Sequence, residues 1–486
     1  MTKPPPTTEN RSPLYLLLAT LAAYLLLQLL WVRATPLQAI TLPDNLPAAR
    51  AETPLLVGLG PDEKEHFLYI VSLAETGRLP RPSPQYRTAP DEYVSYQAQH
   101  PPLFYAAVAV VYRLLHGAAG DSGIWYVLRG LCVLCGASVI IIADKAAKAA
   151  FPNRPLVALG TAPCLAFLPM FGHMTGCLSN EPLAMVFGAL VWMQAVRLIR
   201  RNAAPTVRDA ALLGATLGIA CLTRLTALLW IPVVAVALLQ PGKRSLPTAL
   251  AALAAFVLLL APWLLYNQVA YGHAFLRTFD RPLLAHGSLS DFFGRGIVPA
   301  EFPVPVSFAQ SVLWFAGTAW LPYWLTQFYA PLDLRPFLLL LSAGVGILLL
   351  LKGRDSLRSS DRPDTAGGAI VAAAFAALAF CVAALFQQEL FSDWNAVLSA
   401  GRYLVAAAPA SMLLLTFALS TVPALNRAPV AAALAALMLV FDGYAAMTVS
   451  RFYADHPQQR DVQPITRRAS PQHDLRHGNA ARLAAR

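Results

Sequence analysis

Long apolar runs separated by short basic loops constrain this chain more than any other feature of its sequence. Only 13% of the residues are charged and 57% are hydrophobic, whereas an average globular protein carries about 25% charged residues. A spanning helix needs about 18 or more apolar residues. The pattern therefore predicts an all-α polytopic integral membrane protein with about 11 transmembrane helices, placed at residues 14–32, 124–143, 156–171, 181–199, 209–240 (two helices), 246–266, 332–351, 369–386, 401–419 and 429–447.

Two of the apolar stretches need a specific interpretation. Residues 101–115 are only marginally long enough to span and are broken by Arg113, which is typical of a helix at the membrane surface. Residues 209–240 are too long for one span, and they predict a helical hairpin that turns at Arg224. The apolar runs also divide the chain into three predicted parts. These are an N-terminal tail (1–13), a transmembrane domain (14–450) with long loops at 33–123 and 271–330, and a polar, flexible tail (451–486).

The basic loops predict the orientation of the chain. With the N-terminus in the cytoplasm, every short basic loop lies on the cytoplasmic side, as the positive-inside rule requires. The long loops and the C-terminal tail then face the exoplasmic side of the membrane. The net charge of +11 is explained by these loops and by anionic lipid, without a nucleic-acid partner. The residues concerned are Lys145, Lys148, Arg154, Arg197, Arg200, Arg201, Lys243, Arg244, Lys352, Arg354, Arg358 and Arg427.

The six cysteines indicate no disulfide framework, because five of them lie inside apolar runs. Cys132 and Cys135 have a spacing that redox and metal sites also use, but a single pair flanked by small residues favours plain core cysteines.

The segment 61–67 holds the sharpest chemical signal. Pro61 suits the first turn of a helix, and Asp62 would lie where the helix dipole favours an anion. At helical spacing Asp62 shares a face with His66, and Glu65 shares one with Tyr69. A capped interfacial helix with a solvated acidic start explains the same residues without any function.

Further candidates come from four other segments. His100 precedes two prolines, Asn180 and Glu181 stand at the start of a span, and Arg224 and Arg402 stand near the membrane surface. Helix capping and snorkelling explain each of these alone. Together, however, they place carboxylates, histidine and arginines on one side of the membrane, as a site for a charged, membrane-bound substrate requires.

The ordered set of motifs resembles the GT-C superfamily of membrane glycosyltransferases, in the branch of the protein O-mannosyltransferases and lipid A aminoarabinose transferases. The resemblance covers residues 10–420. Two positions depart from it, because relatives often carry Lys at Arg224 and Asp at Glu181. The matching pieces are Pro61-Asp62-Glu63 with His66 and Tyr69, His100-Pro101-Pro102-Leu103, Ser179-Asn180-Glu181, Leu222-Thr223-Arg224-Leu225-Thr226, Trp263-Leu264-Leu265-Tyr266-Asn267 with Tyr271-Gly272, and Gly401-Arg402-Tyr403.

The resemblance implies a GT-C-type bundle with exoplasmic juxtamembrane helices, and an inverting transfer from a polyprenyl-phosphate-linked sugar donor to a glycan, lipid or protein acceptor. Asp62 is implied as the base, with Glu63 and His66 orienting the acceptor or the base. Arg224, Arg402 and Tyr403 would bind the donor phosphate. Tyr69, His100, Asn180 and Glu181 would contact substrate. No cofactor is expected. A divalent metal at Asp62 and His66 is the alternative, but two ligands do not make a metal site.

Three other functions compete with this one. A transporter or lipid flippase would have the same hydropathy, but it should place ionisable residues along a path through the membrane and often has internal repeats. A surface-glycan polymerase or ligase would share the donor chemistry. A structural membrane protein would leave the Asp62–His66 group without a role. The sugar and the acceptor are not specified by the sequence.

Overall fold

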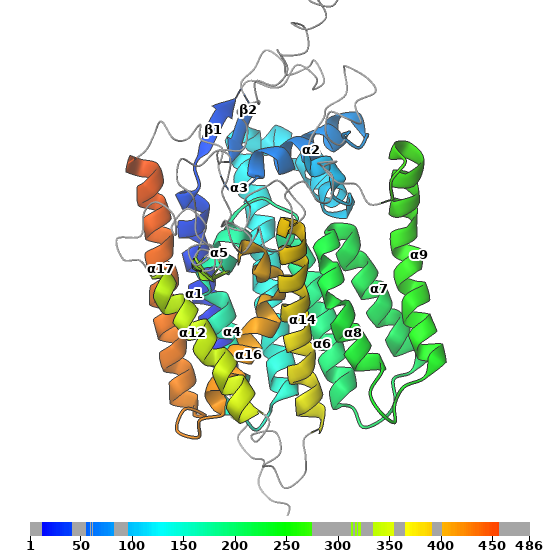
Figure 1. Ribbon diagram of the computed structural model, residues 1–486. Helices are drawn as coiled ribbons and strands as arrows, with labels where there is room; N and C mark the ends of the chain where they lie inside the picture. Colours follow the sequence, from blue (N-terminus) through cyan, green and yellow to red (C-terminus); the bar gives the residue numbers. More distant parts are fainter. Residues whose placement is uncertain are drawn as a thin grey trace, which may run out of the picture.

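The computed structural model describes residues 12–40, 55–58, 60, 62–81, 96–274, 313, 316–317, 319–321, 334–353, 365–390 and 401–455. In this part of the chain the protein is a helical bundle whose long helices run roughly side by side (Figure 1). Its long helices are α1 (Ser12–Ala34), α3 (Leu103–Ala150), α6 (Glu181–Arg200), α7 (Val207–Thr223), α9 (Leu246–Tyr271), α12 (Arg335–Leu348), α14 (Thr365–Leu390), α16 (Ala408–Ser420) and α17 (Ala428–Asp455).

The described residues include eight helices that are long and apolar enough to cross a membrane, or nine if a bent pair counts as one span. The bent pair is α4 (Pro155–Ala166) and α5 (Pro169–Gly176), which meet at an angle of 48°. The sequence predicts one helix here, but Pro169 cannot donate a backbone hydrogen bond and the chain breaks before it. Shorter apolar helices stand beside these spans, and the protein is a polytopic membrane protein of the predicted helical class.

Leu103–Gly120 meets the length criterion for a span but does not cross the bundle. Tyr105, near its start, stacks on Tyr69 with ring centroids 3.8 Å apart. Trp125, just beyond its end, contacts Phe67 at 4.4 Å. Both partners belong to α2 (Glu63–Thr76), so the two ends of this segment lie at the same end of the molecule. A backbone break at Gly120, with φ 67°, reverses the chain. The two ends of the segment thus lie beside α2, and a surface helix over 101–115 stays a prediction.

The predicted hairpin within 209–240 is confirmed. Helix α7 ends at Thr223, and Arg224 is extended, with φ −158°. A 3₁₀ helix η4 (Leu225–Trp230) and helix α8 (Ile231–Leu238) return the chain. The turn lies at Arg224, as the charge in the middle of the apolar run indicated.

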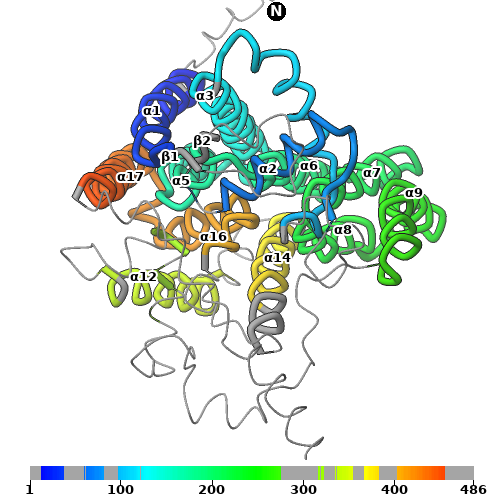
Figure 2. Tube along the Cα trace, turned by 90° about the horizontal axis from the view of Figure 1, so that it is seen from above, coloured from blue at the N-terminus to red at the C-terminus, as the bar shows by residue number. Residues whose placement is uncertain are grey.

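A short ribbon of two antiparallel strands joins α1 to α2. Strands β1 (Leu37–Ile40) and β2 (Leu55–Gly58) pair with Leu37 opposite Gly58. Four-residue strands give too weak a signal to be predicted from an apolar pattern. The ribbon leads directly to Gly60 and the start of α2, which lies across the end of the bundle in Figure 1 and over its centre in Figure 2.

The predicted basic loops meet at the opposite end of the bundle. Arg154 donates to Ser420 Oγ at 3.1 Å, Leu156 N donates to Asn426 Oδ1 at 3.3 Å, and Lys243 donates to the carbonyl oxygen of Arg201. The alternation of basic loops and site segments between the two ends therefore follows the predicted order. All six cysteines are free and five are buried. Most of the predicted loop 271–330 and the tail beyond 455 lie outside the described residues.

Candidate functional site

Asp62 has an unusual backbone conformation immediately before α2. Its φ of 58° and ψ of 8° are left-handed, and it is the one described residue other than glycine with a positive φ. Such a conformation costs an ordinary residue about 1–2 kcal/mol and persists only where the surroundings impose it. Although Asp62 is the N-cap residue of α2, its side chain makes no capping hydrogen bond. The geometry therefore does not support a helix cap as the role of this carboxylate.

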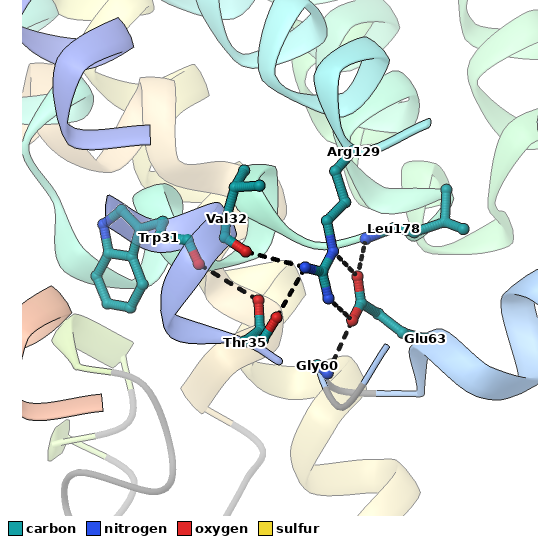
Figure 3. A network of polar contacts seen from close by, with 7 residues as sticks. All are labelled: Trp31, Val32, Thr35, Gly60, Glu63, Arg129 and Leu178. Carbon is teal, nitrogen blue, oxygen red and sulfur yellow. Dashed lines mark hydrogen bonds and ion pairs between the residues drawn. The ribbon is translucent and has the colours of Figure 1, made fainter. Parts of the chain in front are cut away.

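The surroundings that impose this turn are centred on Glu63 (Figure 3). The Glu63 carboxylate accepts hydrogen bonds from the backbone N–H groups of Gly60, at 2.8 Å, and Leu178, at 2.6 Å. It also pairs with Arg129, whose Nε and Nη2 lie 2.9 and 2.6 Å from its two oxygens. A Cβ on Gly60 would lie 2.7 Å from both Glu63 Oε2 and Cys177 Sγ, so only glycine fits there.

Arg129 completes this network from the opposite side. Its Nη1 donates to the carbonyl oxygens of Val32 and Thr35, at 2.9 and 2.7 Å, at the end of α1. The Arg129 and Glu63 side chains are 1% and 0% exposed, and their hydrogen bonds join α1, α2, α3 and the α5–α6 loop. The Glu63 carboxylate is thus fully engaged by protein groups.

Asp62 turns in the other direction, toward Arg402. Nη2 of Arg402 lies 3.3 Å from Asp62 Oδ2 and 2.8 Å from the hydroxyl of Tyr403. The Asp62 side chain is 31% exposed and that of Arg402 is 20% exposed, so both can be reached from outside the protein. Arg402 is the second residue of the 3₁₀ helix η7 (Gly401–Ala407). Residues 340 positions apart in the sequence therefore meet at this end of the bundle.

Arg224 contributes a second guanidinium to the same place. Its Nη1 donates to Asn180 Oδ1 at 2.7 Å, and its Nη2 lies 2.9 Å from Glu181 Oε1. Asn180 in turn donates to the backbone carbonyl of Thr223 at 3.1 Å, which fixes the α7 turn. Both arginines face the Tyr403 ring, with Arg224 at 5.8 Å and Arg402 at 4.8 Å from its centroid. Cation–π contact thus places two cations on one aromatic ring.

A row of aromatic and imidazole rings forms the other wall. His66 Nδ1 lies 2.8 Å from the Tyr105 hydroxyl, and its ring is 6.4 Å from that of His100. Tyr69 donates to the His100 carbonyl at 3.3 Å. Burial, reinforced by Arg224 and Arg402, lowers the pKa of His66 to about 3 against the opposing effect of Asp62. Burial likewise lowers the pKa of His100 well below its usual value. Both imidazoles are therefore neutral at neutral pH.

Two polar atoms in this cluster have no partner among the described residues: Arg402 Nε and Glu181 Oε2. Buried polar groups normally have hydrogen-bond partners, and each exception asks for an explanation. Glu181 and Arg224 also line a small recess whose other walls are apolar except for Thr226. Both atoms are buried, so the cluster holds one donor and one acceptor that lack a protein partner.

The structure brings together all the residues proposed from the sequence except Glu63, whose side chain belongs to the Arg129 network. Contacts connect them in a continuous cluster, from Tyr69 and His100 through His66, whose backbone N–H donates to the Asp62 carbonyl oxygen, to Asp62, Arg402, Tyr403, Arg224, Asn180 and Glu181. Sequence reasoning missed Arg129 and Tyr105. Arg129 had an available signal, since it is the one Arg or Lys in the apolar run 124–143. In the part of the chain that the structure describes, no group of three or more His, Cys, Asp or Glu side chains could hold a metal ion.

Comparisons with known proteins give a structural likeness only. No protein-family model matches the chain, and no curated protein matches it significantly. Among solved structures, the chain is similar to ArnT from Cupriavidus metallidurans bound to undecaprenyl phosphate, with 14% sequence identity and a TM-score of 0.47. It is also similar to the apo state of that protein, with 14% identity and a TM-score of 0.46. Both likenesses cover 92% of this chain and 81% of the other.

Proposed function

We propose that this protein is a membrane glycosyltransferase that moves a sugar from a polyprenyl-phosphate-linked donor to an acceptor on the exoplasmic face of a bacterial plasma membrane. One observation carries the proposal. Sequence pieces that resemble the GT-C motifs, spread from Asp62 to Tyr403, converge on one cluster at one end of a helical bundle. That cluster combines an accessible carboxylate with two arginines, which suits proton removal beside a phosphate leaving group.

In the proposed reaction the acceptor hydroxyl attacks the anomeric carbon while Asp62 takes its proton. The bond between the anomeric carbon and the phosphate oxygen breaks, and its electron pair stays on the polyprenyl phosphate. Arg402 and Arg224 stabilise the charge that develops there, since a guanidinium fork matches phosphate oxygens. A single displacement inverts the anomeric carbon. A positioned base contributes typically about 10²–10⁴-fold to the rate.

The other residues take supporting roles in this proposal. The neutral His66, held by Tyr105, adds no positive charge next to Arg402 and limits the conformations open to α2. Glu181 balances the charge of Arg224 through their ion pair. The polyprenyl chain would remain in the bilayer while its phosphate reaches the end of the bundle.

The test is transfer by purified protein in nanodiscs from a polyprenyl phosphate sugar to an acceptor. We expect Asp62→Asn to insert and fold normally, because this side chain makes no cap, and to lose activity by at least about 100-fold, the lower end for a lost general base. Glu75→Gln, at the exposed end of the same helix, is the matched control and should keep wild-type activity. Near wild-type transfer by Asp62→Asn would contradict the assignment of the base.

A further inference from the structure

A groove on the outside of the bundle has no place in the proposed reaction. It lies between α1 and α17, which are neighbours in both Figure 1 and Figure 2. Its volume is about 330 Å³, which corresponds to roughly eleven water molecules at about 30 Å³ each. It is therefore too large for a single ion. The groove is lined by Leu30, Arg33, Ala446, Met447, Ser450 and Arg451.

The groove is a fixed feature, because α1 and α17 are tied together next to it. Trp31 Nε1 donates to Asp442 Oδ1 at 3.0 Å, and both residues are 0% exposed. A hydrogen bond buried away from water is electrostatically stronger than one at the surface. Ala446, which is also buried, is too small to fill the space above this contact. The two helices are thus held at a set spacing while the gap between their ends stays open.

The lining changes from apolar to cationic along the helices. Leu30 and Met447 are 46% and 53% exposed, and the exposed Leu26 and Val440 continue the apolar surface toward the middle of the bundle. Arg33 and Arg451 are exposed at the helix ends, beside the hydroxyl-bearing Ser450. A phosphate with attached hydrocarbon chains matches this order, with the phosphate beside the arginines and the chains along the apolar side chains.

Arg33 and Arg451 lie at the end of the molecule opposite the short basic loops. Arg33 is in the last turn of α1, next to Val32 and Thr35, which bind the Arg129 network. This is the end that carries α2 and the candidate site. The basic loops that account for topology are at the opposite end, so the positive-inside rule does not account for Arg33 and Arg451.

We propose that the α1–α17 groove binds an anionic glycerophospholipid of the surrounding bilayer. Its phosphate would lie between Arg33 and Arg451, and its acyl chains would follow Leu30 and Met447. Arginine is suited to this role because its planar fork binds phosphate oxygens in pairs. This inference is independent of the proposed transferase activity.

The test is native mass spectrometry of the full-length protein, released from detergent after equilibration with phosphatidylglycerol or phosphatidylcholine of identical chains. We expect phosphatidylglycerol to be retained preferentially. The double variant Arg33→Ala/Arg451→Ala should bind it at least about tenfold more weakly, since two charged hydrogen bonds are lost. Arg208→Ala/Arg427→Ala removes two exposed arginines at the other end and should retain the lipid.

A second variant keeps both charges and fills the space. Ser450→Trp lies at an exposed position, so it should fold and yet reduce phosphatidylglycerol retention by a similar factor. Equal retention of the two lipids by wild type would overturn the proposal, as would unchanged retention in either groove variant. Preferential retention of polyprenyl phosphate over phosphatidylglycerol would overturn it too, by assigning the groove to the carrier lipid.

Discussion

Asp62 and Glu63 are adjacent in the sequence, but the left-handed turn directs them to different parts of the molecule. Glu63 enters a closed network with Arg129, and Asp62 reaches Arg402 on a distant segment. The strained backbone of Asp62 is thereby explained, because the hydrogen bonds of Glu63 to Gly60 and Leu178 hold both sides of the turn. The contacts of Glu63 therefore hold Asp62, the proposed base, in position.

This arrangement makes Glu63→Gln a test of positioning. The change removes one member of a fully buried ion pair and leaves the Arg129 charge without its partner, which typically costs about 3–5 kcal/mol. We therefore expect a clearly lower unfolding temperature in detergent together with reduced transfer. Glu65→Gln on the same helix provides the control. An unchanged melting curve for Glu63→Gln would show that the Arg129 network does not stabilise the fold.

Arg224 offers a prediction on donor binding. Because its guanidinium bridges Asn180 and Glu181 with two different nitrogens, lysine can reproduce only one of these contacts. We expect Arg224→Ala to weaken donor use by about 1.5–3 kcal/mol, or roughly ten- to hundredfold, with Arg224→Lys in between. Arg402→Ala should behave like the alanine variant. Donor titration of transfer rates measures this, and unchanged rates in both alanine variants would remove the arginines from the mechanism.

Most of the site residues could be predicted from the sequence, because motifs with charge stand out in an apolar chain. Their partners could not all be found in this way. Arg129 was missed because a single arginine does not break the hydropathy of its run, and its partner Glu63 is 66 residues away. Asp442 was missed for the same reason, although it pairs with Trp31 from the other end of the chain. The left-handed Asp62 depends on tertiary contacts that no local pattern contains.

At the level of elements, α7 and α9 pack with very close backbones. A Cβ added to Gly214 would overlap the carbonyl oxygen of Ala252, whereas one added to Gly130 on α3 would meet nothing within 4 Å. Glycine thus permits the crossing that holds the α7 turn, and with it Arg224, in place. Small residues at helix crossings are common in membrane bundles for this reason.

These two glycines provide a matched prediction. Gly214→Ala should destabilise the protein by about 1–3 kcal/mol, the usual cost of overpacking, whereas Gly130→Ala should be neutral or slightly stabilising because it improves helix propensity. Thermal unfolding of both variants in the same detergent checks this. If the two variants melt alike, the close α7–α9 crossing is not a feature of the folded protein.

Element boundaries show where apolar patterns suffice and where they do not. The hairpin at Arg224 could be predicted because a charge interrupts a run that is too long for one helix. The break between α4 and α5 could not, because residues 156–171 look like one continuous span and the 48° bend arises at Pro169. Likewise, the backbone break at Gly120 depends on how α2 packs against both halves of α3.

Across the whole molecule, charged groups are separated between the two ends. The end that carries α2 holds the cluster of Asp62, Arg402 and Arg224, and the other end holds the short basic loops. Because the positive-inside rule acts on short loops of this kind, the second end should be cytoplasmic and the candidate site exoplasmic. That orientation is what a lipid-linked donor used outside the cell requires.

Single-cysteine labelling in a cysteine-free background tests this orientation. Arg78→Cys lies at the exposed end of α2, and Asn202→Cys lies in the exposed α6–α7 loop among the basic residues. We expect a membrane-impermeant maleimide to label position 78 in spheroplasts and position 202 only after permeabilisation. The six native cysteines are free and mostly buried, so replacing them removes background without breaking a disulfide. Labelling in the reverse pattern would mean that the bundle has the opposite orientation in the membrane, with Asp62 and both arginines on the cytoplasmic side. That result would contradict the proposal of an exoplasmic transferase. It would not change the contacts within the site.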